Sequence, residues 1–201
     1  LLILLLYLTM LSSIVFYIFK IDKTLTSMIG LLVRFLTLHS LTLTLNHSFF
    51  SHAAFKTKYR IVKFIFSFIA CCSLQKGPLW WSGKHRKHHK YCDKPEDPHS
   101  YVQKGFLNAW AGWVLLPKES NIDKMYVLKH FKDCNGEIYP ELMFLENMWF
   151  TLFIIVNCIM YFGFKIHPRN IFLFFSLPCL AGVPLILLFN VIFHMPNKNT
   201  E

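Results

Sequence analysis

Apolar and polar positions divide the chain into four long apolar blocks and one long polar stretch. The apolar blocks cover residues 1–19, 24–46, 147–164 and 171–193. At about 1.5 Å per residue in a helix, each is long enough to cross a hydrocarbon core of roughly 30 Å. Short polar turns separate the first block from the second and the third from the fourth. The pattern predicts an all-α integral membrane protein with four transmembrane helices in two hairpins.

A shorter apolar segment, residues 61–74, lies inside the polar stretch. It holds about 14 residues, too few to span a bilayer. Lys63 interrupts it and Lys76 follows it closely. These features predict an interfacial or re-entrant helix, and the histidine-rich segment of residues 75–146 is then the polar side of a single membrane domain, 1–201.

Composition supports a membrane protein. Hydrophobic residues make up 54% of the chain and charged residues only 16%, which excludes a disordered, collagen-like or soluble nucleic-acid-binding protein. We therefore expect no nucleic acid partner. The six cysteines show no CxxC spacing, so we expect them to be reduced.

The net charge of +10 is concentrated in one region. Between residues 53 and 140 lie fifteen of the 21 Lys and Arg and seven of the 11 Asp and Glu, an excess of eight positive charges. The positive-inside rule places this region on the cytoplasmic side, with both termini there and both short turns opposite. Arg34 lies within the second apolar block, and we expect it to pair with a lipid phosphate or another chain, or to reach the interface if that helix is shifted.

Histidines carry the clearest chemical signal. Ten are present, and five form two clusters beside the predicted membrane face: an HxxxxH and an HxxHH, consisting of His47, His52, His85, His88 and His89. Residues three and four apart project from one face of a helix, so the second cluster can point at one cavity. Neutral imidazole binds iron, zinc and copper well. The spacing predicts a metal site.

Further motifs accompany the histidines in a fixed order. They are Gln75 to Trp81, the DPHS sequence Asp97 to Ser100, Gly105-Phe106, Gly112-Trp113, Tyr139 to Leu142, and an NxxxH formed by Asn190 and His194. Together they resemble the membrane fatty acyl desaturases of the delta-9 acyl-CoA type, over roughly residues 40 to 194. A zinc- or haem-binding membrane scaffold is a weaker alternative, because it explains neither the DPHS nor the NxxxH motif.

The resemblance implies a di-iron centre that inserts a cis double bond into an acyl chain, using oxygen and two external electrons. It implies that His47, His85 and His89 bind one iron, with Asn190 acting through a water, and that the other iron is bound by His52, His88 and His194. Asp97 and His99 would support these ligands, and Trp81 would contact the substrate. His39, His130 and His167 match no motif.

The resemblance also implies partners and a location. The substrate would be a fatty acyl chain or lipid, and the electron donor an acidic protein such as a b-type cytochrome or a ferredoxin, suited to the basic region. The family suggests the endoplasmic reticulum membrane. A mitochondrial or plastid membrane is the alternative, and it suits a subunit role.

Some positions depart from the family pattern. Ser48 stands where an Arg is usual, Trp110 stands where a His precedes the Gly-Trp pair, and no second HxxHH follows His194. We therefore expect three imidazoles per iron and an incomplete or empty centre in this chain. Two explanations stay open: a fragment of a longer enzyme, or a catalytically incomplete desaturase-like accessory subunit bound to other membrane subunits.

Overall fold

The computed structural model describes residue 40 and residues 43–116 and 121–193. Within these residues the regular elements are helices, and extended backbone pairs only in an isolated antiparallel bridge between Lys132 and Ile138. The prediction of an all-helical protein is confirmed for the described part of the chain. The first two expected spans, 1–19 and 24–46, lie almost wholly outside the described residues, as do Arg34 and His39.

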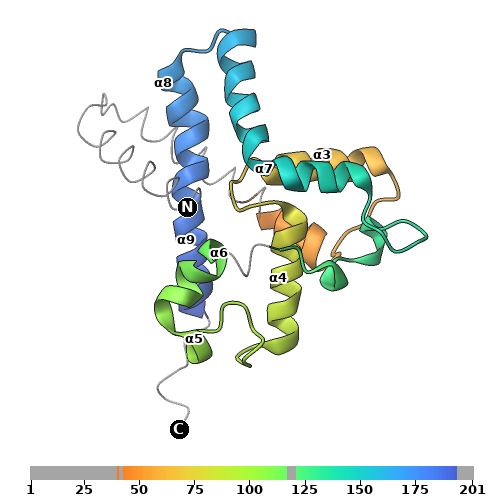
Figure 1. The fold of residues 1–201 in the computed structure, drawn as a ribbon. Helices are drawn as coiled ribbons and strands as arrows, with labels where there is room; N and C mark the ends of the chain where they lie inside the picture. Colours follow the sequence, from red (N-terminus) through yellow and green to blue (C-terminus); the bar gives the residue numbers. More distant parts are fainter. Residues whose placement is uncertain (1–39, 41–42, 117–120, 194–201) are drawn as a thin grey trace.

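Among the described residues, two helices are long and apolar enough to cross a membrane. The first is α7 (Pro140–Cys158), which continues as the π-helix η6 (Ile159–Gly163). The second consists of α8 (Pro168–Ile171), the π-helix η7 (Phe172–Ser176) and α9 (Leu177–Phe193). The later part of the first helix lies beside α8 at the top of the view, joined to it by a short turn, whereas α9 continues down past them (Figure 1). The first of these helices begins earlier than the expected residue 147, because Pro140 suits the first helical turn.

Helix α3 (Arg60–Cys71) runs across the direction of α8 and α9 and lies along the beginning of α7 (Figure 1). Its inner face buries Ala70 and Cys71 completely, whereas Ile61 and Ile65 are exposed. A two-pronged ion pair between Arg60 and Glu141 joins α3 to the start of α7. The Lys63 ammonium donates to the His130 carbonyl at 2.6 Å, which ties α3 to the segment that precedes α7. Exposed apolar side chains beside the exposed Arg60 suit a helix in the membrane interface, which stays a prediction.

The histidine-bearing elements rest on a buried aromatic core. The π-helix η1 (Thr44–Ser51) contributes Phe49 and Phe50, which are completely buried, and Phe50 stacks on Phe131 with ring centroids 4.9 Å apart. Helix α4 (Pro78–Tyr91) contributes Leu79 to the same core. This packing holds η1 against α4.

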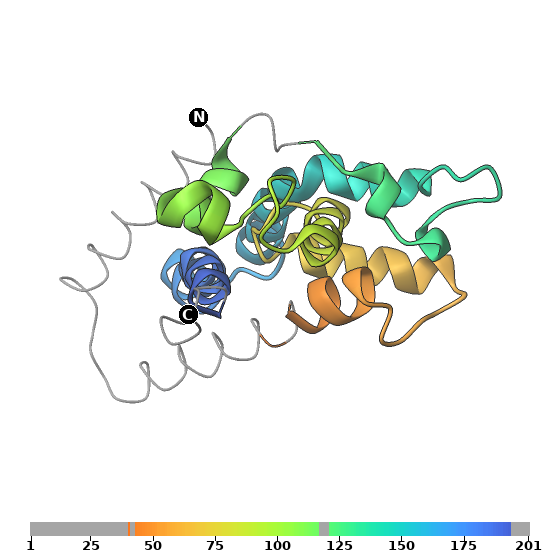
Figure 2. The same ribbon diagram turned by 90° about the horizontal axis from the view of Figure 1, so that it is seen from below.

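The remaining short helices lie around α4. They are α5 (Tyr101–Leu107), the π-helix η2 (Asn108–Gly112), α6 (Trp113–Leu115), and the 3-10 helices η4 (Lys124–Tyr126) and η5 (Lys129–Phe131). Among them, η5 brings Phe131 to the core shared with η1. Seen from below, the stretch from α5 to α6 lies beside α9 (Figure 2). The Trp110 indole donates to the Pro184 carbonyl of α9 at 3.1 Å, and Trp113 stacks on Trp80 of α4. Helix α4 is thus held between η1 and this stretch.

Candidate metal centre

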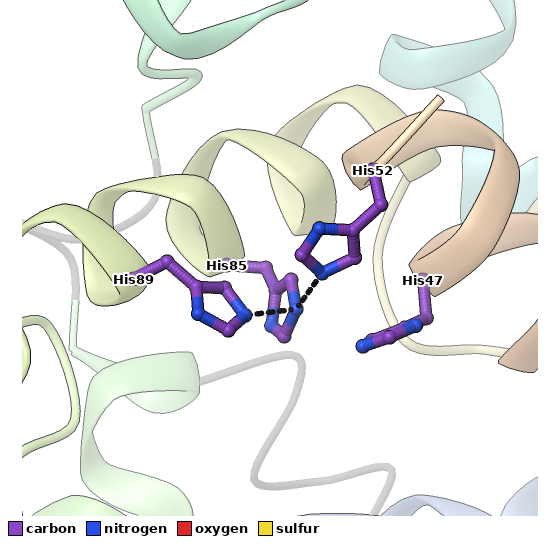
Figure 3. Close-up of side chains that lie close together, drawn as sticks. All are labelled: His47, His52, His85 and His89. Carbon is purple, nitrogen blue, oxygen red and sulfur yellow. Dashed lines mark hydrogen bonds between the residues drawn. The ribbon is translucent and has the colours of Figure 1, made fainter. Parts of the chain in front are cut away.

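Four histidines, from η1, the residue that follows it and α4, point toward one another (Figure 3). Each offers one ligand atom, and these atoms all lie within 4.8 Å of one another; we call His47, His52, His85 and His89 the four-histidine cluster. Nε2 of His85 lies at its centre, 3.1 Å from Nε2 of His52 and 3.0 Å from Nε2 of His89. Nitrogen lone pairs from two separate elements therefore converge on one small volume.

Local helix geometry explains both spacings. The backbone N–H of His52 donates to the carbonyl of His47 at 3.0 Å, which is the i to i+5 bond of a π-helix. Residues five apart face the same side there, so the HxxxxH spacing brings both rings together. In α4 the four-residue spacing of His85 and His89 does the same on an ordinary α-helix. Arg86 then donates to the Ser51 carbonyl at 2.9 Å and ties α4 to the end of η1.

Burial and mutual repulsion favour the neutral imidazoles of His85 and His47. Burial, followed by repulsion from His89, His47, His52 and His88, lowers the pKa of His85 to about 2. Burial and then His52 lower the pKa of His47. Metal binding requires the unprotonated imidazole, so the cluster is poised for a cation. His52 and His89 are exposed, which leaves one side open to solvent.

The distances fit a shared ion. Two ligand atoms at right angles around a metal with bonds of about 2.1 Å lie about 3.0 Å apart. The separations of 3.0 and 3.1 Å around His85 match that value. Imidazole suits iron, zinc, copper and nickel, so the donor set fits the iron that the resemblance implies but does not select it.

His88 lies beside the cluster, and its Nδ1 faces Asp97. Its Nδ1 lies 2.8 Å from Oδ2 of the fully buried Asp97, and its ring stacks on His99 at 4.1 Å. Both Asp97 oxygens already accept hydrogen bonds, Oδ2 also from the backbone of Asp93 and Oδ1 from that of His99. Asp97 is therefore placed to orient His88 rather than to bind an ion itself.

The charge of Asp97 follows from these contacts. Burial alone raises the pKa of its carboxyl, but the hydrogen bonds from His88 and His99 outweigh this, so the pKa lies below its ordinary value. Cys92 lies close to His88 and Asp97. Burial and then the charge of Asp93 raise the pKa of the Cys92 thiol, which disfavours the thiolate that metals bind.

The other sequence-predicted residues lie in several places. Trp81 stacks on His85, with ring centroids 4.7 Å apart, and forms one wall of the cluster. Asn190 lies in α9 and is half-buried, while His194 lies outside the described residues. His130 packs on Phe131 at 4.0 Å, and His167 caps the start of α8. Both lie apart from the four-histidine cluster.

Sequence reasoning missed one buried carboxylate. Glu146 of α7 accepts hydrogen bonds from the backbone N–H groups of Leu79 and Trp80 at the start of α4. The sequence offered a weak signal, a lone Glu next to the expected third span. Its partners are 67 and 66 residues away, so no local pattern could reveal them.

Comparison with known proteins gives a consistent result. The fatty acid desaturase family model matches residues 24–200. The delta(9)-fatty-acid desaturase fat-6 of Caenorhabditis elegans is 32% identical over 111 residues, covering 54% of this chain and 31% of that protein. An acyl-CoA delta(11) desaturase of Trichoplusia ni is 36% identical over 80 residues, covering 39% and 22%. The hex-5-enoyl-(acyl-carrier protein) acetylenase of Moorena producens is 37% identical over 98 residues, covering 43% and 30%.

These matches span less than a third of each relative's own length. No solved structure gave a significant match. The family model nevertheless extends over most of the sequence, including both histidine motifs. The chain belongs to the fatty acid desaturase family.

Proposed function

We propose that the chain performs oxygen-dependent desaturation of fatty acyl chains at a histidine-ligated di-iron centre. The observation that carries this proposal is the convergence of four imidazoles from η1 and α4 in a desaturase-family chain with two apolar helices long enough to cross a membrane. An accessory-subunit role would give no reason for these rings to converge.

Each residue of the site would have its own role in binding iron and substrate. The four-histidine cluster would supply neutral nitrogen ligands, and Asp97 would hold the proton of His88 on Nδ1, so that its lone pair is on Nε2. Trp81 would form an apolar wall beside His85. Bound iron would supply oxygen-dependent removal of two hydrogens from unactivated carbons, which protein side chains cannot perform.

The substrate class is an acyl chain. The printed names of the relatives include acyl-CoA, acyl-carrier-protein and palmitoyl-monogalactosyldiacylglycerol enzymes, which share the acyl chain and differ in its carrier. We therefore propose a long apolar acyl substrate and leave the carrier unassigned. The donor of electrons would be an acidic b-type cytochrome or ferredoxin, and the location an endoplasmic reticulum, mitochondrial or plastid membrane.

Expression of the full chain in a host that requires unsaturated fatty acids tests the function. New double bonds in the host lipids, found by gas chromatography and mass spectrometry, are the expected result. His85→Ala should abolish them, because it removes the central nitrogen of the cluster. His167→Asn is the matched control, since the exposed His167 caps α8. A folded, membrane-inserted chain that produces no double bond contradicts the proposal.

A further inference from the structure

The first turn of α4 is capped by a side chain from another helix. Oε2 of Glu146 accepts the backbone N–H of Leu79 at 2.8 Å, and Oε1 accepts that of Trp80 at 3.1 Å. In an α-helix, the N–H groups of the first turn are satisfied by groups outside the helical ladder, such as a capping side chain. The N-cap residue is Gly77, which has no side chain to supply. The α7 carboxylate therefore does what a local Ser or Asp would otherwise do.

The Glu146 carboxylate fills the space beside Gly77 at the start of α4. Glu146 is only 5% exposed. A Cβ added at Gly77 would overlap the Glu146 carboxylate, although the φ of −83° at Gly77 suits any residue. The glycine is thus required by the room that the carboxylate takes, and not by the backbone conformation.

The capped turn determines where the histidines lie. His85 follows Trp80 by five residues, a rise of about 7.5 Å along a helix. Because the two carboxylate oxygens bind successive N–H groups, they fix both the axial position and the rotation of α4 where it begins. A rotation by one residue, about 100°, would turn His85 and His89 away from His47 and His52.

We propose that Glu146 is a positioning residue for the four-histidine cluster: through α4 it sets His85 and His89 against His47 and His52. The inference rests on the proposed metal-binding function and deepens it. Glu146 itself is no ligand, since both its oxygens are engaged at the far end of α4 from His89. The position of the cluster is thereby tied to the apolar helix α7.

The experiment titrates the purified full chain in detergent with Co²⁺ and follows the ligand-field absorption of the bound ion. Glu146→Gln keeps the shape of the side chain but replaces one of its two acceptor oxygens with an NH2 group. That NH2 group cannot accept a hydrogen bond from the backbone N–H of α4. We expect the Co²⁺ dissociation constant to rise about tenfold, with an altered spectrum. The matched control is Glu141→Gln, which removes another carboxylate of α7, the one that contacts Arg60. It should leave the Co²⁺ dissociation constant and the spectrum unchanged.

A second pair of variants separates this contact from general damage. Gly77→Ala should displace the Glu146 carboxylate from the start of α4. It should therefore weaken Co²⁺ binding about as much as Glu146→Ala does. The double variant should bind as Glu146→Ala does, because the added methyl then occupies the vacated space. Further weakening in the double variant would overturn the proposal, as would Glu146→Gln binding Co²⁺ like the unaltered chain.

Hydrogen exchange followed by mass spectrometry gives a readout without metal. Glu146→Gln should accelerate exchange in α4 while leaving that in α9 unchanged. If the unaltered chain binds no Co²⁺, the proposed metal function fails, and exchange alone decides whether Glu146 positions α4. Unchanged exchange in α4 would then overturn the positioning role.

Discussion

Nδ1 of His88 lies 2.8 Å from Oδ2 of Asp97, and both side chains are buried. The pKa of the Asp97 carboxyl lies below its ordinary value, because the hydrogen bonds from His88 and His99 outweigh the effect of burial. An ionised acceptor requires a donor, so the proton of His88 belongs on Nδ1 and the lone pair on Nε2. The pair thereby selects the tautomer that a metal ligand needs.

Replacement of Asp97 tests this relationship. In Asp97→Asn the amide can present its NH2 to Nδ1, which favours the opposite tautomer. We predict that the Co²⁺ affinity of the chain falls by about 10- to 100-fold. The control is Glu96→Gln, which removes an exposed neighbouring carboxylate. Equal affinities for Asp97→Asn and the unaltered chain would show that His88 does not depend on this contact.

Acid should weaken the metal-free fold through His85. Its folded-state pKa is about 2, because of burial and then of the neighbouring imidazoles, against an ordinary value of 6.5. The unfolded chain therefore takes up this proton first as the pH falls. The contribution of His85 to stability is full above pH 6.5 and declines as the pH falls from there toward 2.

The loss of stability in acid can be checked by the midpoint of thermal unfolding. It is measured in detergent, without metal, from about pH 8 to about pH 5. It should fall on acidification, and His85→Gln should reduce the fall because glutamine carries no titrating group. His167→Gln, at an exposed site, serves as the control. An acid response identical in His85→Gln and the unaltered chain would contradict the assignment to His85.

The sequence predicted the members of the site better than their arrangement. The HxxxxH and HxxHH spacings identified all four residues of the cluster as candidates. A helical face spans about 100°, however, so the spacing could not tell that His88 would point to Asp97 instead of to His85. The capping of α4 by Glu146 depends on tertiary packing between distant segments, which no local pattern records.

Parts of the fold could likewise be predicted from the sequence, and other parts could not. Apolar blocks were enough to predict the two long helices that end the described chain. The π-helical turn at η1 was not predicted, because its side chains suit an α-helix as well.

A docked electron donor should recognise the basic side of the molecule. Lys94 is exposed just after α4, on the side predicted to be cytoplasmic, whereas Lys165 is exposed in the turn between α7 and α8. We predict that turnover with an acidic donor slows as ionic strength rises. Lys94→Glu should lower kcat/KM for the donor and flatten the salt dependence, and Lys165→Glu should do neither. Turnover insensitive to salt would argue against this docking side.

The geometry of the four-histidine cluster limits how much metal this chain retains. Four imidazoles share one small volume, whereas the Asp97 oxygens beside His88 are already occupied by hydrogen bonds. Two neighbouring dications repel each other strongly unless anionic ligands lie between them. We therefore predict that the second iron of the proposed centre binds more weakly than the first, so that the 201-residue chain retains about one ion after loading with Fe²⁺ and desalting, and that His85→Ala retains none. Elemental analysis gives the metal per chain, and Mössbauer spectra distinguish isolated from coupled irons. Two irons retained through desalting, with a coupled spectrum, would contradict the weaker second site.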